Sequence, residues 1–404
     1  MVKIGSASLR IHTYNSIKNM IKKKIIIFTS AGGNGHMSVT RALMDLLEQR
    51  YDIKYVYAYT DVLQDVDFFQ WLTKKRICGE DVYNYCLQKK WIFMIHFFFI
   101  IGRWYFWLYK KKTLSLLNKY LLEHKPDLII SVMPLINGAL LHSAKNLNIP
   151  FLLIPTDLDT TTFMYEIDKI LYKKFKIIAT FNDPDVLKTV PAYLHKEHIV
   201  FSRFPIRKDF FTHKDTVAIK NKWAVPVNKK IVLVMMGGQG SYATLLFAQE
   251  LAHVMSPIHL IVCIGNFTTI ENALTAINFP DHITITIVKF THEIADLMAI
   301  ADIIITKSGS VSFCEALYSG KPIVLDGTSS TLLWEEFNHT FLKKYTLGDI
   351  IYNIKDTPRL IEKILHNNEL VSTYADNINA IIRSEHQNNQ AIQDIIHTML
   401  ENAR

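Results

Sequence analysis

The pattern that most constrains the fold of this 404-residue chain is a unit of strand, glycine turn and helix that occurs twice. Residues 25–35 are an apolar run that leads into a glycine turn, and residues 41–49 continue as an amphipathic helix. Residues 231–240 repeat the run and the turn, and residues 242–254 repeat the helical pattern. A buried parallel strand followed by such a turn and helix is typical of doubly wound folds. The repeat therefore predicts two successive α/β domains.

Further short apolar runs extend this pattern through both halves of the chain. Many of their residues are β-branched, and helical segments separate them, as in parallel sheets that helices cover on both faces. The runs are at residues 128–132, 151–154, 260–264, 283–288, 303–306 and 323–325. Ligands of such sheets bind beyond the carboxyl ends of the strands. We therefore expect two Rossmann-like domains whose parallel sheets face each other across a cleft.

The expected domain boundary lies where the pattern turns polar and loses its periodicity, between Arg207 and Pro226. We assign residues 1–210 to an N-terminal domain and residues 211–368 to a C-terminal domain. Residues 369–404 are predicted to form a C-terminal helix that packs back toward the N-terminal domain. The length of the chain suits two domains of roughly 200 residues each.

The composition favours a cytoplasmic protein with one basic half. Its 4 cysteines form no Cys-x-x-Cys pair and no pattern with histidine, so neither a zinc site nor a disulfide framework is predicted. The apolar run after the lysines at 22–24 is too short for the core of a signal peptide. Residues 1–200 hold 27 Lys and Arg against 17 Asp and Glu, whereas residues 201–404 hold 18 against 20. Such a basic half can face nucleic acid or an anionic lipid surface.

The sharpest motif is in the second half, where residues 301–322 contain a strand, a Ser/Gly turn and a short helix that ends at Gly320. The N-terminus of this helix offers unpaired N–H groups and the positive end of the helix dipole, both suited to a diphosphate. Glu315 lies just over one turn inside the helix, where its carboxylate could accept hydrogen bonds from two ribose hydroxyls. The alternative is that Ser308 and Ser310 cap the helix and that Glu315 is solvated.

The segment from Phe290 to Glu315 also carries a family resemblance. It resembles, without a gap, the nucleotide-binding segment of the MurG-type enzymes, which are GlcNAc transferases of peptidoglycan synthesis. It is also similar to that of the diacylglycerol glycosyltransferases, including monogalactosyldiacylglycerol synthase. This resemblance to family 28 implies a GT-B fold, inverting transfer and a UDP-sugar donor, with Glc, Gal or GlcNAc as the hexose. It places the backbone of Thr291 against the uracil, Ser308 to Ser310 near the diphosphate and Glu315 on the ribose.

Other motifs of the family occur in the same order along most of the chain. They are the turn from Gly32 to His36, residues 125–131, the sequence Pro155-Thr156-Asp157, residues 204–207 and the loop from Gly237 to Gly240. The donor-binding residues that the resemblance implies are Gly33, Gly35, Gly238, Gly240, Phe290, Thr291, Lys307, Ser308, Gly309, Ser310, Glu315, Glu335 and Asn338.

The chain departs from the glycolipid enzymes at two places. Glu335 and Asn338 match the spacing of their Pro-Gly-Gln-Glu motif and its following Asn, but Trp334 replaces the Gln. The segment after Asp157 lacks the usual Trp and His. These departures leave the identity of the sugar and of the acceptor open.

His36 directly follows the first glycine turn, at the mouth of the first sheet. An imidazole with an unperturbed pKa near ~6.5 can take a proton from an acceptor hydroxyl at neutral pH, which is the general-base step of inverting transfer. A histidine in a turn more often caps a helix or faces solvent. Since the family also has a histidine at this place, we predict that His36 is the catalytic base.

Asp157 is the second predicted catalytic residue, and with Leu158 and Asp159 it forms an Asp-x-Asp sequence. In the other main glycosyltransferase fold this motif holds a metal ion that bridges the diphosphate. Here the helix N-terminus and Lys307 could neutralise the phosphates instead. We therefore expect no metal, and no cofactor beside the UDP-sugar as co-substrate. Asp157 is placed in the acceptor cleft, with a solvated loop carboxylate as the alternative.

Residues 91–112 are the most apolar and aromatic part of the chain. The stretch from Trp91 to Gly102 is 12 residues long, whereas a membrane-spanning helix needs roughly 20 apolar residues. Clustered aromatic residues beside lysines suit a helix that lies in the membrane interface. A buried core helix is the alternative, and nucleic acid is disfavoured because the aromatic residues are contiguous rather than spaced along a basic groove. The predicted membrane contacts are Trp91, Phe98, Arg103, Trp104 and Trp107.

Together these features predict a metal-independent, inverting glycosyltransferase. It would move a hexose from a UDP-sugar to a lipid acceptor such as diacylglycerol or a polyprenyl- or lipid-linked sugar, at the anionic inner face of the cell membrane. One alternative is a UDP-sugar 2-epimerase of the same fold, which would need no lipid-facing segment. Another is a non-catalytic, nucleotide-sugar-binding membrane regulator, which would have no use for His36 and Glu315.

Overall fold

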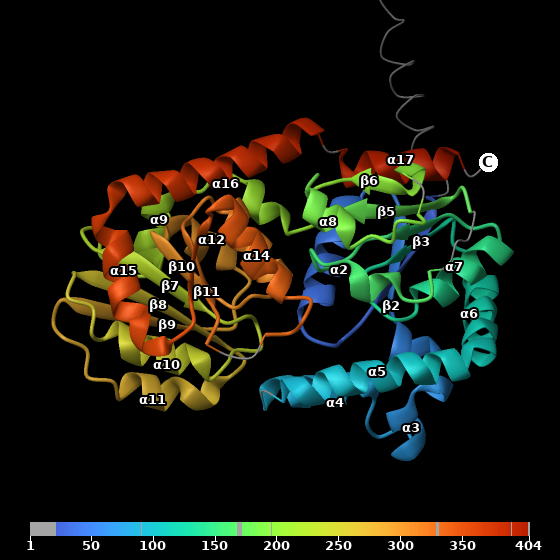
Figure 1. Ribbon diagram of the computed structural model, residues 1–404, viewed down its shortest axis with the longest axis horizontal. Coiled ribbons are helices and arrows are strands. Elements are labelled where there is room, and N and C mark those ends of the chain that lie inside the picture. Colours follow the sequence, from blue (N-terminus) through green and yellow to red (C-terminus); the bar gives the residue numbers. More distant parts are fainter. Residues whose placement is uncertain are drawn as a thin grey trace, which may run out of the picture.

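The computed structural model contains two parallel sheets of six strands, one in each half of the chain (Figure 1). It describes residues 22–89, 91–167, 172–194, 196–328, 331–388 and 390–402, and the part of the signal-peptide prediction that concerns residues 1–21 lies outside them. The first sheet has the strand order β2-β1-β3-β4-β5-β6. Its strands are β1 (Lys24–Thr29), β2 (Asp52–Tyr57), β3 (Leu128–Ser131), β4 (Phe151–Leu153), β5 (Phe175–Ala179) and β6 (Ile199–Phe201).

The second sheet has the strand order β12-β11-β10-β7-β8-β9. Its strands are β7 (Lys230–Met235), β8 (Ile258–Gly265), β9 (Ile283–Lys289), β10 (Ile303–Thr306), β11 (Ile323–Asp326) and β12 (Gly348–Ile351). All residues of β3, β4, β8, β10 and β11 are buried, as expected for strands that helices cover on both faces. The predicted α/β fold class is confirmed.

Each sheet reverses its strand order at one point, and these two points position the site. β1 lies between β2 and β3, and β7 lies between β8 and β10. Open α/β sheets bind their ligands where the order reverses, outside the carboxyl ends of the strands. The glycine turn at residues 30–34 follows β1, and the loop at residues 236–241 follows β7. Both glycine turns therefore lie where ligands are expected.

Helices connect the strands in both halves. In the first half they are α2 (Gly35–Leu47), α3 (Phe68–Leu72), α4 (Gly79–Gln88), α5 (Ile92–Leu108), α6 (Lys110–His124), α7 (Asn137–Asn146) and α8 (Pro184–Lys188). In the second half they are α9 (Thr216–Lys222), α10 (Ala243–Leu251), α11 (Glu271–Thr275), α12 (Ile294–Ile300), α13 (Ser310–Tyr318), α14 (Glu336–Tyr345) and α15 (Thr357–His366).

The two C-terminal helices bridge the halves. Helix α16 (Asn368–Asn388) runs along the second half, and α17 (Ile392–Glu401) lies beside β5 and β6 of the first (Figure 1). The backbone N–H of Gln390 donates to the carbonyl oxygen of Phe201 at 3.0 Å, and the side-chain amide of Gln393 donates to the carbonyl of Leu46 at 2.8 Å. The last helix and the residues just before it are thus attached to the first half.

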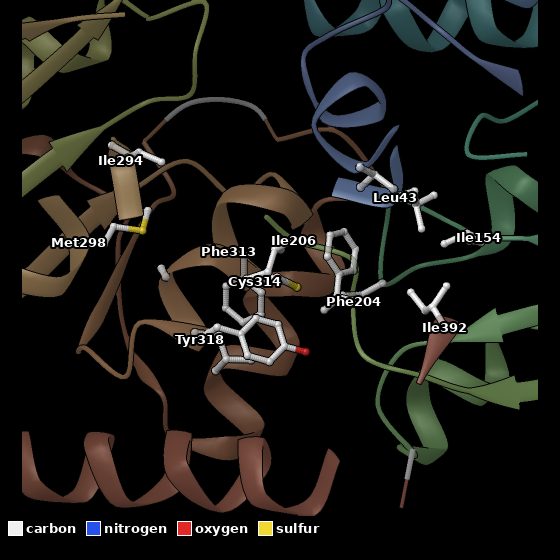
Figure 2. Close-up of a cluster of buried hydrophobic side chains, with 14 of the residues drawn as sticks. Leu43, Ile154, Phe204, Ile206, Ile294, Met298, Phe313, Cys314, Tyr318 and Ile392 are labelled. Atoms are coloured by element: carbon white, nitrogen blue, oxygen red, sulfur yellow. The ribbon is translucent and has the colours of Figure 1, made fainter. Parts of the chain in front are cut away.

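One apolar cluster runs through both halves. Figure 2 shows Phe204, Phe313 and Tyr318 between side chains of the first half, such as Leu43, and side chains of the second half, such as Ile294. Burial of these side chains favours one relative arrangement of the two sheets. Residues from both halves can therefore form a single site.

Helix α5 is apolar yet lies at the surface, along the lower edge of the first half in Figure 1. Ile95 is the only residue of this 17-residue helix that is classed as buried. Within the described part of the chain, no single helix is long and apolar enough to cross a membrane. Helices α5 and α6 together reach the required length and apolar composition, but the chain bends by 77° between them. The core-helix alternative for residues 91–109 is therefore wrong.

Candidate active site in the cleft

The two glycine turns contact each other where the two halves meet. The side-chain amide of Gln239 donates to Oδ1 of Asn34 at 3.3 Å. A Cβ atom on Gly238 would lie 2.8 Å from Nδ2 of Asn34, and one on Gly240, where φ is +74°, would lie 2.1 Å from the carbonyl oxygen of Ile264. Glycine is thus needed in the second turn for close approach and backbone conformation. The turns bring the N-termini of α2 and α13 together, with Val311 3.5 Å from a Cβ built on Gly35.

His36 occupies the first turn of α2, where two neighbouring groups fix its ring. Nδ1 lies 2.8 Å from the carbonyl oxygen of Val132 and 3.0 Å from the hydroxyl of Thr156. Because a carbonyl oxygen only accepts hydrogen bonds, Nδ1 carries the proton, and the lone pair is on Nε2. Phe163 supports the ring edge-on at 6.4 Å. The arrangement gives a neutral imidazole with one basic nitrogen.

Burial changes the acidity of His36. Removal from water lowers the pKa of its ring from 6.5 to about 4, although the bond to Val132 acts in the opposite direction. The predicted unperturbed pKa near ~6.5 is therefore wrong. A lower pKa keeps the base unprotonated at neutral pH, but it also makes the ring a weaker base.

Asp157 lies at the contact between the halves. Its Oδ1 accepts a hydrogen bond from the hydroxyl of Ser310, the first residue of α13, at 3.1 Å. Burial and then the negative charge of Glu335 raise the pKa of Asp157 to about 7. The neighbouring Asp159 instead accepts hydrogen bonds from Thr161 of the following turn. The two carboxylates of the Asp-x-Asp sequence thus have different partners.

Glu315 is buried in α13, where the two halves meet. Its carboxylate lies 3.5 Å from the guanidinium of Arg207, which also donates to the carbonyl of His292 at 2.7 Å. Burial raises the pKa of Glu315 to about 7, and the arginine opposes this shift. The solvated alternative for Glu315 is therefore wrong. Arg207 links the segment after the first sheet to the carboxylate that the family resemblance predicts to bind the ribose.

The predicted phosphate-binding turn is held by an internal network. The hydroxyl of Ser308 contacts Nε2 of His339, and the amide of Asn338 donates to the carbonyl of Ser308 at 2.6 Å and to the hydroxyl of Ser310 at 3.0 Å. Gly309, rather than a serine, is the N-cap residue, and no side chain caps α13. The two serines therefore stabilise the conformation of the turn, and Asn338 of α14 stabilises it through its two hydrogen bonds.

Lys307 and Glu335 face each other beside this turn. Nζ of Lys307 lies 3.8 Å from Oε1 of Glu335. A Cβ on Gly309 would lie 2.9 Å from that amine, and one on Gly237 would lie 3.2 Å from Cε of Lys307. The lysine thus extends between the two glycine-containing segments, beside the predicted diphosphate site.

Phe290 and Thr291 occupy the segment after β9, and Phe290 lies beside the second glycine turn. The ring of Phe290 is exposed and would lie 3.4 Å from a Cβ on Gly238. The hydroxyl of Thr291 accepts the backbone N–H of Glu293 at 3.0 Å. Gly33, with φ at +67°, completes the turn of the first half.

A pocket of about 180 Å³ joins the two predicted catalytic residues to α5. Its lining includes His36 and Asp157 and is otherwise mainly apolar, with Phe98, Phe99 and Phe106 from α5. An apolar pocket with a few convergent polar groups is the usual form of a binding site for a small or amphiphilic ligand. The site can therefore hold an apolar ligand beside a neutral base.

Comparisons with known proteins relate the chain to glycosyltransferases. Residues 231–330 match the model of the glycosyltransferase family 28 C-terminal domain. The chain is 22% identical over 383 residues to a processive diacylglycerol beta-glucosyltransferase of Bacillus pumilus, covering 93% of this chain and 94% of that protein. The enzyme of the same name from Bacillus subtilis is 24% identical over 313 residues, covering 75% and 77%. The fold is that of Acinetobacter baumannii MurG, with a TM-score of 0.61, 15% identity and coverage of 94% and 100%.

The chain is a glycosyltransferase with the GT-B fold, and its second half contains the family 28 domain. An Arabidopsis thaliana UGT enzyme, solved with UDP-L-rhamnose, shares the fold with a TM-score of 0.60 at 12% identity, covering 95% of this chain and 100% of that one. The names of the relatives are those of glycosyltransferases, so the enzyme is a hexosyltransferase, and the epimerase and regulator alternatives gain no support.

Two residues that the sequence analysis missed hold the first glycine turn of the glycosyltransferase. Glu80 of α4 accepts hydrogen bonds from the hydroxyl of Ser30 at 2.5 Å and from the backbone N–H of Ala31 at 2.9 Å. One helical turn later, Asn84 accepts from the N–H of Gly33 at 2.8 Å. The spacing of four residues places both side chains on one face of the helix. Helix α4 thus clamps the turn that carries His36.

The predicted membrane residues of the glycosyltransferase divide into two groups. Trp91, Arg103, Trp104 and Trp107 are exposed, as an interfacial role requires. Phe98 points the other way, because it lines the pocket and contacts Phe69 at 5.4 Å. Its position suits contact with a ligand better than contact with a bilayer.

Proposed function

We propose that the enzyme transfers a hexose with inversion from a UDP-sugar to the hydroxyl of a membrane lipid, without a metal ion. The observation that carries the proposal is the position of His36. A neutral imidazole with its proton fixed on Nδ1 lines an apolar pocket, opposite the N-terminus of α13. A base, an apolar acceptor pocket and an anion-binding helix end therefore meet in one cleft.

The donor would bind to the second half. The N-terminus of α13 and the amine of Lys307 would stabilise the diphosphate, because both supply positive charge there. Glu315 would accept hydrogen bonds from the ribose hydroxyls. The neighbour that was solved with UDP-L-rhamnose supports a UDP-linked donor for this fold.

The chemical step would proceed by direct displacement. Nε2 of His36 takes the proton of the acceptor hydroxyl while the hydroxyl oxygen forms a bond to the anomeric carbon. The bond from that carbon to the β-phosphate oxygen breaks, and UDP leaves with the electron pair. The helix N-terminus and Lys307 stabilise the added charge on the leaving group. Attack on the face opposite UDP inverts the anomeric centre.

A lipid acceptor is supported by the relatives and by the surface around α5. The relatives are named diacylglycerol beta-glucosyltransferases, and a β-product from an α-linked UDP-sugar requires inversion. Trp71 and Leu72 of α3 are exposed, and Phe68 of the same helix contacts Tyr105 of α5. Exposed basic residues, among them Arg103, Lys111 and Lys112, would meet anionic headgroups. This surface would place the pocket at the inner face of the membrane, where diacylglycerol or a lipid-linked sugar could enter.

A donor screen tests the proposal. Purified enzyme is incubated with a membrane lipid extract, EDTA and one of UDP-Glc, UDP-Gal and UDP-GlcNAc, and the lipids are analysed by mass spectrometry. The expected result is a lipid heavier by one sugar residue with one of the donors, in β-linkage by NMR. No modified lipid with any donor, even after magnesium or manganese is restored, would contradict the proposal; a product only with added metal would contradict its metal-free part.

A further inference from the structure

The acceptor pocket is lined by residues of both halves of the enzyme. Most of its lining comes from the first half, including His36 and Asp157. The side of α5 that lines the pocket, called its inner face below, includes Ile95, Phe98 and Phe99. Trp334 is the exception, because it belongs to the loop between β11 and α14 of the second half. The domain that carries the predicted donor site therefore supplies one large aromatic wall of the acceptor pocket.

Contacts with α5 hold Trp334 in this position. Its ring lies 5.5 Å from that of Phe99 and 5.9 Å from that of His96, measured between ring centroids. The backbone N–H of the preceding Leu333 lies 3.3 Å from Nε2 of His96, which accepts its hydrogen bond. Buried Leu332 joins the same apolar cluster as Ile95. The loop is thus fixed to the inner face of α5 by apolar packing and one hydrogen bond.

The next residue of the loop faces the donor side. Glu335 lies 3.8 Å from Lys307 beside the turn before α13. Two consecutive residues thus lie in different sites. Trp334 lines the apolar pocket, and Glu335 lies near the predicted diphosphate site. Contact of an acceptor with the indole would therefore not require a change at the donor contacts.

We propose that Trp334 is an acceptor-binding residue that selects for an apolar chain. Its ring forms one wall of the pocket, Phe98 and Phe99 belong to the same lining, and the acyl chain of the acceptor packs among them while its hydroxyl reaches His36. Trp334 is partly exposed within this pocket, so it offers a flat apolar surface to a ligand. The inference rests on the lipid acceptor proposed above.

Substitutions in the loop separate this role from a structural one. In Trp334→Ala, KM for dioctanoylglycerol in mixed micelles should rise about tenfold, as expected when roughly 60 Å² of apolar contact is lost, whereas UDP affinity changes less than twofold. Trp334→Phe should keep most of the affinity, since a smaller aromatic ring remains. The matched control is Leu333→Ala, because Leu333 is 65% exposed, does not line the pocket and keeps its backbone N–H for His96.

A comparison of acceptors with different chains gives a second test. The ratio of KM between Trp334→Ala and the wild type should fall toward one when dioctanoylglycerol is replaced by a glycerol ester with a single short chain, because less apolar surface is left to bind. If KM for dioctanoylglycerol stays within twofold of the wild type, or if UDP affinity falls by the same factor, the inference is wrong. Should Trp334→Ala not fold, Trp334→Leu is measured in its place with the same expectations. A wild type that glycosylates no lipid would instead contradict the proposed function, and this inference with it.

Discussion

At the scale of single residues, Glu315 tests the donor site most directly. Its carboxylate is buried next to Arg207, and removing a charge-assisted acceptor of ribose hydrogen bonds costs about 1.5–3 kcal/mol. Glu315→Ala should therefore weaken UDP binding roughly ten- to hundredfold, measured by calorimetry. Unchanged affinity in the folded variant would remove Glu315 from the ribose site.

The pH dependence of UDP binding gives a second signature of the same carboxylate. Its pKa is raised to about 7, so the protonated form prevails below pH 7 and the accepting form prevails above it. Affinity should therefore rise as the pH increases through about 7. Glu315→Gln cannot ionise and serves as the control that lacks this contribution, while titration of UDP itself affects both proteins alike.

At the scale of elements, α5 carries the membrane prediction. Three rings of α5, those of Phe93, Trp104 and Trp107, are at least 58% exposed. If each contributes about 1.5 kcal/mol on entering the interface, their replacement by serine should weaken binding to anionic vesicles more than roughly hundredfold. UDP affinity should stay the same, because the three rings do not line the pocket. Cosedimentation with vesicles measures the first quantity and calorimetry the second.

A control for this experiment is available on the second half. Val227 and Met255 are also highly exposed apolar residues, and their double replacement by serine should leave vesicle binding unchanged. Equal loss of vesicle binding in both variants would mean that general surface hydrophobicity, not α5, drives adsorption. Undiminished binding of the triple variant would contradict the interfacial role of the helix.

At the scale of the whole molecule, the sequence predicts those features of the fold that depend on local residue patterns. Apolar runs, glycine turns and the motif around Ser308 predict two parallel sheets and the position of the turns. The clamp of Glu80 on Ser30 and the contact of Trp334 with His96 were not predictable, because they join residues far apart in the chain. The inward direction of Phe98 also depends on how α5 packs. The acidity of His36 was missed for the same reason, since burial by other segments lowers its pKa.

The central claim is that a neutral His36 in the first half acts on an acceptor while the second half holds the donor. The deciding measurement compares the wild type with His36→Gln, through UDP affinity and through kcat/KM for the acceptor at saturating donor from pH 5.5 to 8.5. UDP affinity should agree within twofold, while kcat/KM should fall about 10² to 10⁴-fold. Because the pKa of His36 is about 4, the ratio of the two kcat/KM values should vary less than about twofold across this range.

If the pKa of His36 were 6.5, the ratio of the wild-type kcat/KM to that of His36→Gln would instead fall about tenfold from pH 7.5 to pH 5.5. Most of the histidine would then be protonated at the lower pH. A variant that keeps more than a tenth of the wild-type kcat/KM would show that His36 is not the base, and it would make Asp157, whose pKa is about 7, the next residue to test.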